Sequence, residues 1–186
     1  NGLPWVALTS HAVAEHGTLE VFKWGCENDF QEDDVCILSR AAATGNEEIV
    51  RWGIEHGMGR HYVEYNAARK GHTHILRLLA ELGHPWTPEV IEGAIWGGRV
   101  DILKAARGVG LEVGEPDDFE KILARGDMEV VNWAQKQYNF FETFDWHHNR
   151  ACEHSAIGGN LEMLKWLRER ECVWDIKIIL QAAGNG

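Results

Sequence analysis

Residues 45–57 of the chain read GNEEIVRWGIEHG. A glycine opens the stretch, and an asparagine follows whose side-chain oxygen can accept hydrogen bonds from free amides in the first turn of a helix. Two glutamates come next, near the positive end of the helix dipole, and the apolar residues Ile49 and Val50 follow them. Gly57 lies twelve residues after Gly45, where a glycine can end a helix in the left-handed conformation. The stretch therefore predicts a helix of about three turns.

The same pattern recurs along most of the chain. Its opening glycines are separated by 28, 26, 27, 28, 33 and 27 residues. They are Gly17, Gly45, Gly71, Gly98, Gly126, Gly159 and Gly186. A second apolar segment precedes each glycine, and small residues such as Ala41 and Ala42 near the turn allow the two helices to approach closely. Each unit is therefore predicted to be a helix, a turn, a second helix and a short loop.

A helix pair of this length cannot bury its apolar face alone, so neighbouring units must pack together to form a continuous core. The predicted fold class is all-α, with the units arranged as an α-solenoid. Residues 1–186 are expected to form a single domain of about six to seven units, of which the first and last are incomplete. Because both ends fall within a unit, the chain is expected to belong to a longer array.

The repeated positions resemble the pattern of the ankyrin-repeat family. The AA-x-x-G turn, the G-[HND]-x-E-[IV]-[VL]-[KR] second helix and the Thr87–Pro88 helix start match that pattern. More narrowly, the chain resembles a divergent ankyrin subclass with units of about 27 residues and a G-x-P-W loop, here at 83–86 and 2–5. The resemblance implies helix-turn-helix repeats in which the β-hairpin of standard ankyrin units is reduced to a loop. It also implies a scaffold that binds proteins and has no catalytic activity.

The composition of the 186-residue chain excludes several classes of protein. Its formal net charge is −11, which disfavours nucleic acid as a partner, since binding to phosphate backbones needs clustered lysine and arginine. No apolar run approaches the roughly 18 residues of a membrane span, so direct membrane insertion is not expected. The four cysteines are widely spaced and form no CxxC pair, which disfavours a disulfide scaffold and favours an intracellular setting, in the cytoplasm or an organelle. No G-x-G-x-x-G or P-loop motif occurs, and no cofactor is expected.

Two kinds of repeated side chain are interpreted as structural. A tryptophan recurs seven residues after the opening glycine, and its periodicity predicts packing in the core. It is Trp24, Trp52, Trp133 or Trp166, according to the unit. Basic residues such as Lys23 and Arg51 recur one position earlier, and acidic residues such as Glu20 and Glu48 lie three residues before them. That spacing places acid and base on one helix face and predicts ion pairs that neutralise the basic ridge.

One cluster of possible metal ligands lies in the longest unit, at His147, His148, Cys152 and His154. His148 and Cys152 are four residues apart and would share a helix face, and His154 or the neighbouring glutamate would add a ligand. Against this, His147 and His148 point to different faces, and Cys152 occupies a core position of the repeat. The expectation is therefore no bound metal, and a metal-dependent enzyme that uses these residues is the less favoured alternative.

The chain is predicted to bind another protein within a larger complex, through the concave face and loops of the array. The 33-residue unit is the first candidate because its departure from the repeat has no packing cause. Its aromatic and imidazole side chains are of the kind enriched in binding hot spots, and they are Phe140, Phe141, Phe144, Trp146 and His147. In the alternative interpretation these side chains pack onto their own core. A second alternative for the function is the substrate-recognition arm of a larger adaptor, such as a ubiquitin-ligase receptor.

Overall fold

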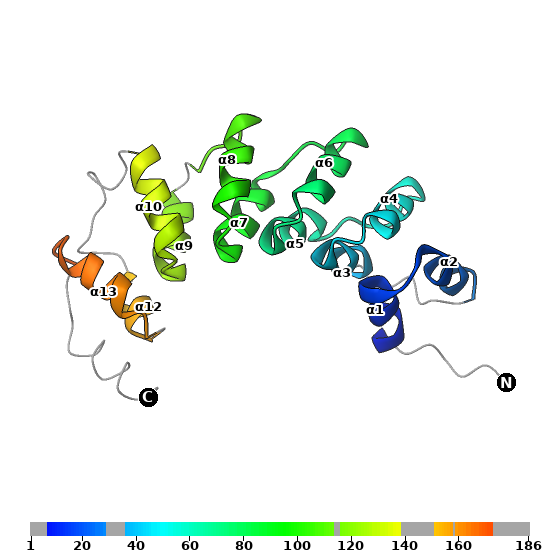
Figure 1. Cartoon of the computed structure of the whole chain (residues 1–186), viewed down its shortest axis with the longest axis horizontal. Helices are drawn as coiled ribbons and strands as arrows, with labels where there is room; N and C mark the ends of the chain where they lie inside the picture. The colour runs from blue at the N-terminus through cyan, green and yellow to red at the C-terminus, as the bar shows by residue number, and fades with distance from the viewer. Residues whose placement is uncertain (1–6, 29–35, 114–115, 139–150, 158, 173–186) are drawn as a thin grey trace. The chain divides into compact units, whose positions relative to one another are not determined.

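The structure of the chain is a computed structural model that describes residues 7–28, 36–113, 116–138, 151–157 and 159–172 (Figure 1). The described residues form helices and connecting loops, and no strand occurs among them. The chain divides into two compact units, Asn1–Glu112 and Val113–Gly186. Within each unit the helices pack in the order of the sequence, so the predicted all-α class is confirmed. The expectation of one domain over 1–186 stays a prediction.

In the first unit the odd-numbered helices are the first members of the predicted pairs, and the even-numbered helices are the second members. They are α1 (Ala7–His16), α2 (Leu19–Glu27), α3 (Ile37–Thr44), α4 (Glu47–Glu55), α5 (Val63–Lys70), α6 (Thr73–Glu81), α7 (Pro88–Gly97) and α8 (Val100–Gly108). The described helices of the second unit are α9 (Pro116–Arg125), α10 (Met128–Gln137), α12 (Ala151–Ile157) and α13 (Leu161–Arg168). Gly45, Gly71 and Gly98 end three first helices with φ of 77°, 89° and 69°, in the left-handed region that glycine adopts without strain.

In four of the repeats, the residue after the opening glycine makes a hydrogen bond to the preceding repeat. Asn46 caps its own helix by accepting from the amide of Ile49 at 3.3 Å, and its side-chain NH₂ donates to the carbonyl oxygen of Gly17 at 3.2 Å. Asn160 makes the same two bonds in the second unit, and its bond to the carbonyl oxygen of Gly126 is 2.6 Å long. The side chains of Thr18, Asn46, Asp127 and Asn160, each directly after an opening glycine, accept cap bonds from amides in the first turn of the following helix, as the sequence predicts for Asn46.

Two repeats carry an arginine or a histidine after the opening glycine, and these side chains bond to the preceding repeat without capping their helix. Arg99 makes no side-chain cap bond, but its guanidinium donates to the carbonyl oxygen of Lys70 at 3.0 Å. His72 likewise does not cap its helix, and its Nε2 lies 3.0 Å from the carbonyl oxygen of Ala43. In both repeats the hydrogen bond to the preceding repeat is therefore retained, although the side chain does not cap the helix.

The first helices of the first unit pack against each other more extensively than the second helices do, and the α5–α7 contact is the most extensive. Two glycines on α7 allow this approach. A Cβ atom on Gly93 would run into the carbonyl oxygen of Tyr65, and one on Gly97 would run into the carbonyl oxygen of Arg69. Because α7 has no side chain at these two positions, the backbones of α5 and α7 come together. The α2–α4 contact is much smaller.

The core of the second unit lies between α9, α10, α12 and α13. Ile122 and Leu123 of α9 occupy the positions where most repeats carry small residues, and both are fully buried. Cys152 of α12 is also buried, as its repeat position predicts, and it forms a disulfide with Cys172 just beyond α13. The sequence spacing did not predict this bond, which joins cysteines 20 residues apart whose Cα atoms are separated by 6.6 Å.

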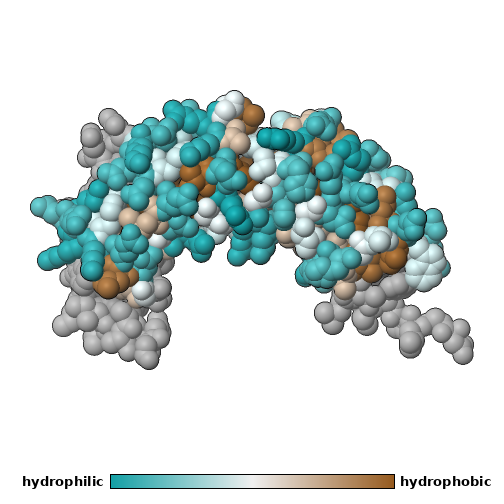
Figure 2. Space-filling view, in the orientation of Figure 1, coloured by the Kyte–Doolittle hydropathy of each residue, from teal (hydrophilic) through white to brown (hydrophobic). Residues whose placement is uncertain are grey.

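The repeated tryptophan does not have the same environment in every repeat. Trp133 is only 7% exposed, so the prediction of a core position is confirmed there. Trp24 is 53% exposed, so the prediction is wrong for that residue, and Trp52 is half-buried. Outside this set, the indole nitrogen of Trp86 donates to the carbonyl oxygen of Leu76 at 2.9 Å. On the face drawn in Figure 2, hydrophilic residues cover most of the described surface, and apolar residues form small separate areas.

Candidate functional site

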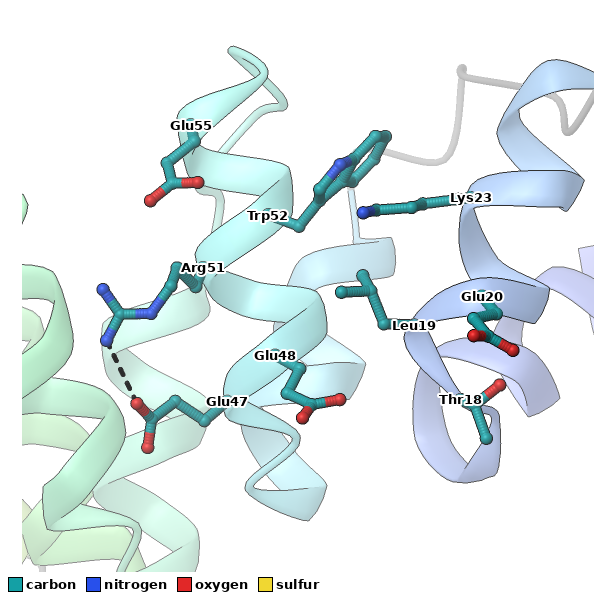
Figure 3. A pocket seen from close by; sticks show the side chains of 9 residues that line it. All are labelled: Thr18, Leu19, Glu20, Lys23, Glu47, Glu48, Arg51, Trp52 and Glu55. Atoms are coloured by element: carbon teal, nitrogen blue, oxygen red, sulfur yellow. Dashed lines mark hydrogen bonds and ion pairs between the residues drawn. The ribbon is translucent and has the colours of Figure 1, made fainter.

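A groove of about 930 Å³ lies between α2 and α4 in the first unit. Figure 3 shows Lys23 extending from α2 toward the indole of Trp52 on α4, with the side chains of Leu19 and Glu48 between the two helices. The groove is lined by Thr18, Leu19, Glu20, Lys23, Glu47, Glu48, Arg51, Trp52 and Glu55. It is open to solvent because these two second helices make only a small contact with each other.

The repeat explains why the two walls carry matching residues. Thr18 caps α2 and Asn46 caps α4, and the two caps are 28 residues apart. The helices therefore present the same repeat positions at the same height, so that Glu20 on α2 corresponds to Glu48 on α4. Both glutamates are exposed. The register set by the caps thus places one carboxylate on each wall of the groove.

Trp52 forms the aromatic part of the groove, and its ring is held from several sides. The buried ring of Phe22 meets it edge to face with 5.8 Å between centroids. His56, one turn later on the chain, stacks on it with centroids 4.1 Å apart. The ammonium of Lys23 lies 5.8 Å from the centre of the indole, within the range of a cation–π interaction. Trp52 therefore combines a packed edge with ring surface that faces a cation.

The charges in the groove differ from the sequence prediction. Arg51 pairs with Glu47 at 3.2 Å, at a spacing of four residues. The predicted pairs at a spacing of three, Arg51 with Glu48 and Lys23 with Glu20, are absent from the described ion pairs, so that prediction is wrong in this part of the chain. Residues four apart share a helix face as residues three apart do, so the pair with Glu47 is as compatible with the helix as the predicted one. The carboxylates of Glu20 and Glu48 line the groove with no ion pair to a described residue.

A second cleft, of about 510 Å³, lies where α5 and α7 begin. Arg60 donates to the buried Glu64 at 2.6 Å on its wall. Tyr62 is 64% exposed and has a φ of 59°, a backbone conformation that is unusual and strained for a bulky side chain. At the start of α7, a hydrogen bond with Thr87 is the main cause that lowers the pKa of Glu89 below its ordinary value of 4.5. This cleft is smaller than the α2–α4 groove and its charges are more nearly balanced.

The binding residues predicted from the sequence lie outside the described residues. These are Phe140, Phe141, Phe144, Trp146 and His147. The metal-ligand candidate His148 also lies outside them, and nothing is described for the side chain of His154. Cys152 is 1% exposed and its sulfur is bonded to Cys172, so it is not available as a metal ligand in this state. In the described part of the chain, no three His, Cys, Asp or Glu side chains are grouped so as to hold a metal ion.

Sequence reasoning missed the α2–α4 groove, although it singled out the positions that line it. The repeated tryptophan was assigned to the core, and the charged positions were assigned to self-neutralised pairs on a solvated face. A signal was nevertheless present, because residues 47 and 48 are both glutamate, whereas Arg51 is the one basic residue in the stretch 45–55. In the α2–α4 groove, this leaves the carboxylate of Glu48 in a lining that also contains Trp52.

The arrangement in the groove suits binding better than chemistry. Its lining contains no His, Cys or Ser side chain, and the hydroxyl of Thr18 accepts the cap bond from the amide of Val21 at 3.4 Å. The groove therefore offers carboxylates, a cation and an indole without a nucleophile and base within hydrogen-bond reach.

Comparison of the chain with models of known protein families and with curated proteins gives no match.

Proposed function

We propose that the chain is a non-catalytic scaffold that binds another protein within a larger complex. In this proposal the helix pairs form an ankyrin-like solenoid with reduced hairpins, and the partner is held by side chains that the array presents without burying them. The observation that carries the proposal is the α2–α4 groove, where a half-buried tryptophan lies among charged residues, of which Glu20, Glu48 and Glu55 are exposed. Aromatic side chains of this kind are enriched where proteins bind each other.

The packing of the first unit supports this proposal. Its first helices contact each other extensively and form a rigid base, whereas the second helices α2 and α4 stay apart. A surface that is fixed before binding loses less conformational entropy when a partner arrives. The hydrogen bonds of Asn46 and Arg99 also hold the array in place, because each joins the turn before a second helix to the preceding repeat.

We also propose that the protein works inside the cell, in the cytoplasm or an organelle. No described helix has both the length and the apolar content that a bilayer span requires. The Cys152–Cys172 disulfide makes this placement testable, because the two cysteines would be reduced in a reducing compartment. In such a compartment we expect both cysteines to react with iodoacetamide after denaturation, and a pair that resists alkylation would place the protein in an oxidising environment.

Partner capture followed by reconstitution tests the scaffold function. The full chain is immobilised and exposed to an extract of its native source, and captured polypeptides are identified and then produced separately. We expect at least one of them to bind the purified chain at a defined stoichiometry in isothermal titration calorimetry. If every captured polypeptide fails to bind the purified chain, the scaffold function is wrong.

A further inference from the structure

We propose that the α2–α4 groove binds a basic segment of a partner protein, with an arginine or lysine side chain seated between Trp52 and the carboxylates of Glu20 and Glu48. This inference rests on the proposed scaffold function and names the chemistry of the partner. Three features of the groove carry it: the aromatic ring, the excess of acidic groups, and a lysine of the chain itself that already lies beside the ring.

The aromatic ring supplies the first contact. A cation near the face of an indole is attracted by the negative potential of the ring, and arginine makes this contact more often than lysine does. Lys23 lies 5.8 Å from the centre of the Trp52 ring, which demonstrates that a cation is accommodated at this position. The edge contact with Phe22 and the stacking of His56 fix the ring, so it does not have to be ordered when a partner binds.

The carboxylates supply the second contact and determine the sign of the ligand. Four glutamates and two basic residues line the groove, and one of the basic residues, Arg51, is already paired with Glu47. Glu20 and Glu48 lie on opposite walls and have no described ion-pair partner, so a guanidinium between the helices can approach either of them. A polyanion such as RNA would meet the same groups with unfavourable electrostatics.

The shape of the groove favours a side chain on a peptide over a free ion. Leu19 and the indole of Trp52 are half-buried apolar surfaces within it, and they match the aliphatic stem of arginine or lysine. A volume of about 930 Å³ also exceeds what one ammonium or metal ion fills, and leaves room for neighbouring residues of an extended segment. The ligand class that fits all three features is therefore a basic peptide segment.

Lys23 gives the proposal a distinctive consequence. Its ammonium occupies the cation position beside Trp52, so a partner's basic side chain has to displace it or share the ring with it. Removal of this charge should strengthen binding, because the face of the indole becomes accessible and one repulsive charge is lost from the groove. Lys23→Gln is therefore expected to gain affinity for basic peptides.

The experiment selects short peptides from a random displayed library on the immobilised full chain and measures the binding of those enriched by fluorescence anisotropy. The variants are Glu48→Gln, Lys23→Gln and, as a matched control, Glu129→Gln. Glu129 holds the same repeat position on α10 and is also exposed, but it does not line the groove. Circular dichroism confirms that each variant is folded before binding is measured.

We expect the selected peptides to be rich in arginine and lysine. Glu48→Gln should weaken their binding by about twofold to fivefold, and Lys23→Gln should strengthen it by about twofold, with little change for Glu129→Gln. Selection of peptides without basic residues, or equal weakening by Glu48→Gln and Glu129→Gln, would overturn the groove assignment and leave the scaffold function intact. Enrichment of no peptide would also overturn it, and partner capture would then decide the scaffold function separately.

Discussion

The α5–α7 contact and the α2–α4 groove lie in the same unit and are built from the same repeat, yet one is closed and the other is open. On α7, Gly93 and Gly97 remove side chains at the positions that face α5, so two backbones meet. On α4 and α2, the side chains of Trp52, Lys23 and Glu48 line the groove between the helices. The turns and caps of this repeat thus set the register, whereas close approach of two helices depends on positions without a side chain, such as Gly93 and Gly97.

This division of roles has a functional meaning. A closed contact stabilises the array, because apolar surface is removed from water and the helices are fixed. An open groove stabilises the chain less, but it leaves an indole and carboxylates available to a partner. Substitutions at the closed contact should therefore affect unfolding, and substitutions in the groove should affect binding while leaving the free energy of unfolding nearly unchanged.

The largest effect is expected at the closed contact. Gly93→Ala places a methyl group against the carbonyl oxygen of Tyr65, and the overpacking should lower the free energy of unfolding by about 1–3 kcal/mol. Chemical denaturation followed by circular dichroism measures this change. Gly108→Ala at the end of α8 is the control, because no atom beyond its chain neighbours and its own helix backbone lies within 4 Å of the added methyl group. We expect that control to stabilise the protein by about 0.4–1 kcal/mol, and loss of stability in both variants would contradict the account.

A smaller effect is expected at the hydrogen bond between neighbouring repeats. Asn46→Ala removes the cap bond to Ile49 and the bond to the carbonyl oxygen of Gly17, which should lower the free energy of unfolding by about 1–2 kcal/mol. Asn46→Asp separates the two roles, since it keeps an oxygen for the cap but has no donor for Gly17. Its stability, measured by the same denaturation, should lie between those of the native chain and Asn46→Ala. An aspartate variant as unstable as Asn46→Ala would rule out the capping role.

In the open groove, the effect on stability should be smaller still. Glu48 is exposed and makes no described ion pair, so Glu48→Gln should change the free energy of unfolding by less than about 0.5 kcal/mol. Thermal unfolding of the two proteins side by side measures the difference. A loss comparable to that of Gly93→Ala would mean that the groove is part of the structural core, which is opposite to its assignment here.

The smallest effect concerns the start of α7. The hydrogen bond with Thr87 lowers the pKa of Glu89, so ionised Glu89 stabilises the fold at pH values above about 4.5, and this contribution is lost as the pH falls through the lowered pKa. Thr87→Val should raise the pKa of Glu89 toward 4.5 in a titration of its carboxyl carbon by NMR. Because Glu89 is exposed, the accompanying loss of stability at neutral pH should be slight. An unchanged pKa would show that Thr87 is not the cause.

The regular part of the fold was predictable because local chemistry determines it. Asn46 was recognised as a cap, and Gly57 as a helix end, since these roles depend on a few residues nearby in the chain. The choice of Glu47 over Glu48 by Arg51 was not predicted, because spacings of three and four residues are both compatible with a helix face. The exposure of Trp24 and the approach allowed by Gly93 depend on how neighbouring helices are separated, and a single repeat does not contain that information.

Hydrogen–deuterium exchange of the full chain, without and with an enriched basic peptide, distinguishes the closed α5–α7 contact from an open α2–α4 groove that binds a partner. In the free protein, we expect amides of α5 and α7 to exchange more slowly than those of α2 and α4, since the closed contact opens only with larger unfolding. Addition of the peptide should slow exchange in 19–27 and 47–55 and leave α5 and α7 unchanged. Equal exchange at both places in the free protein, or protection by the peptide that omits α2 and α4, would contradict the account.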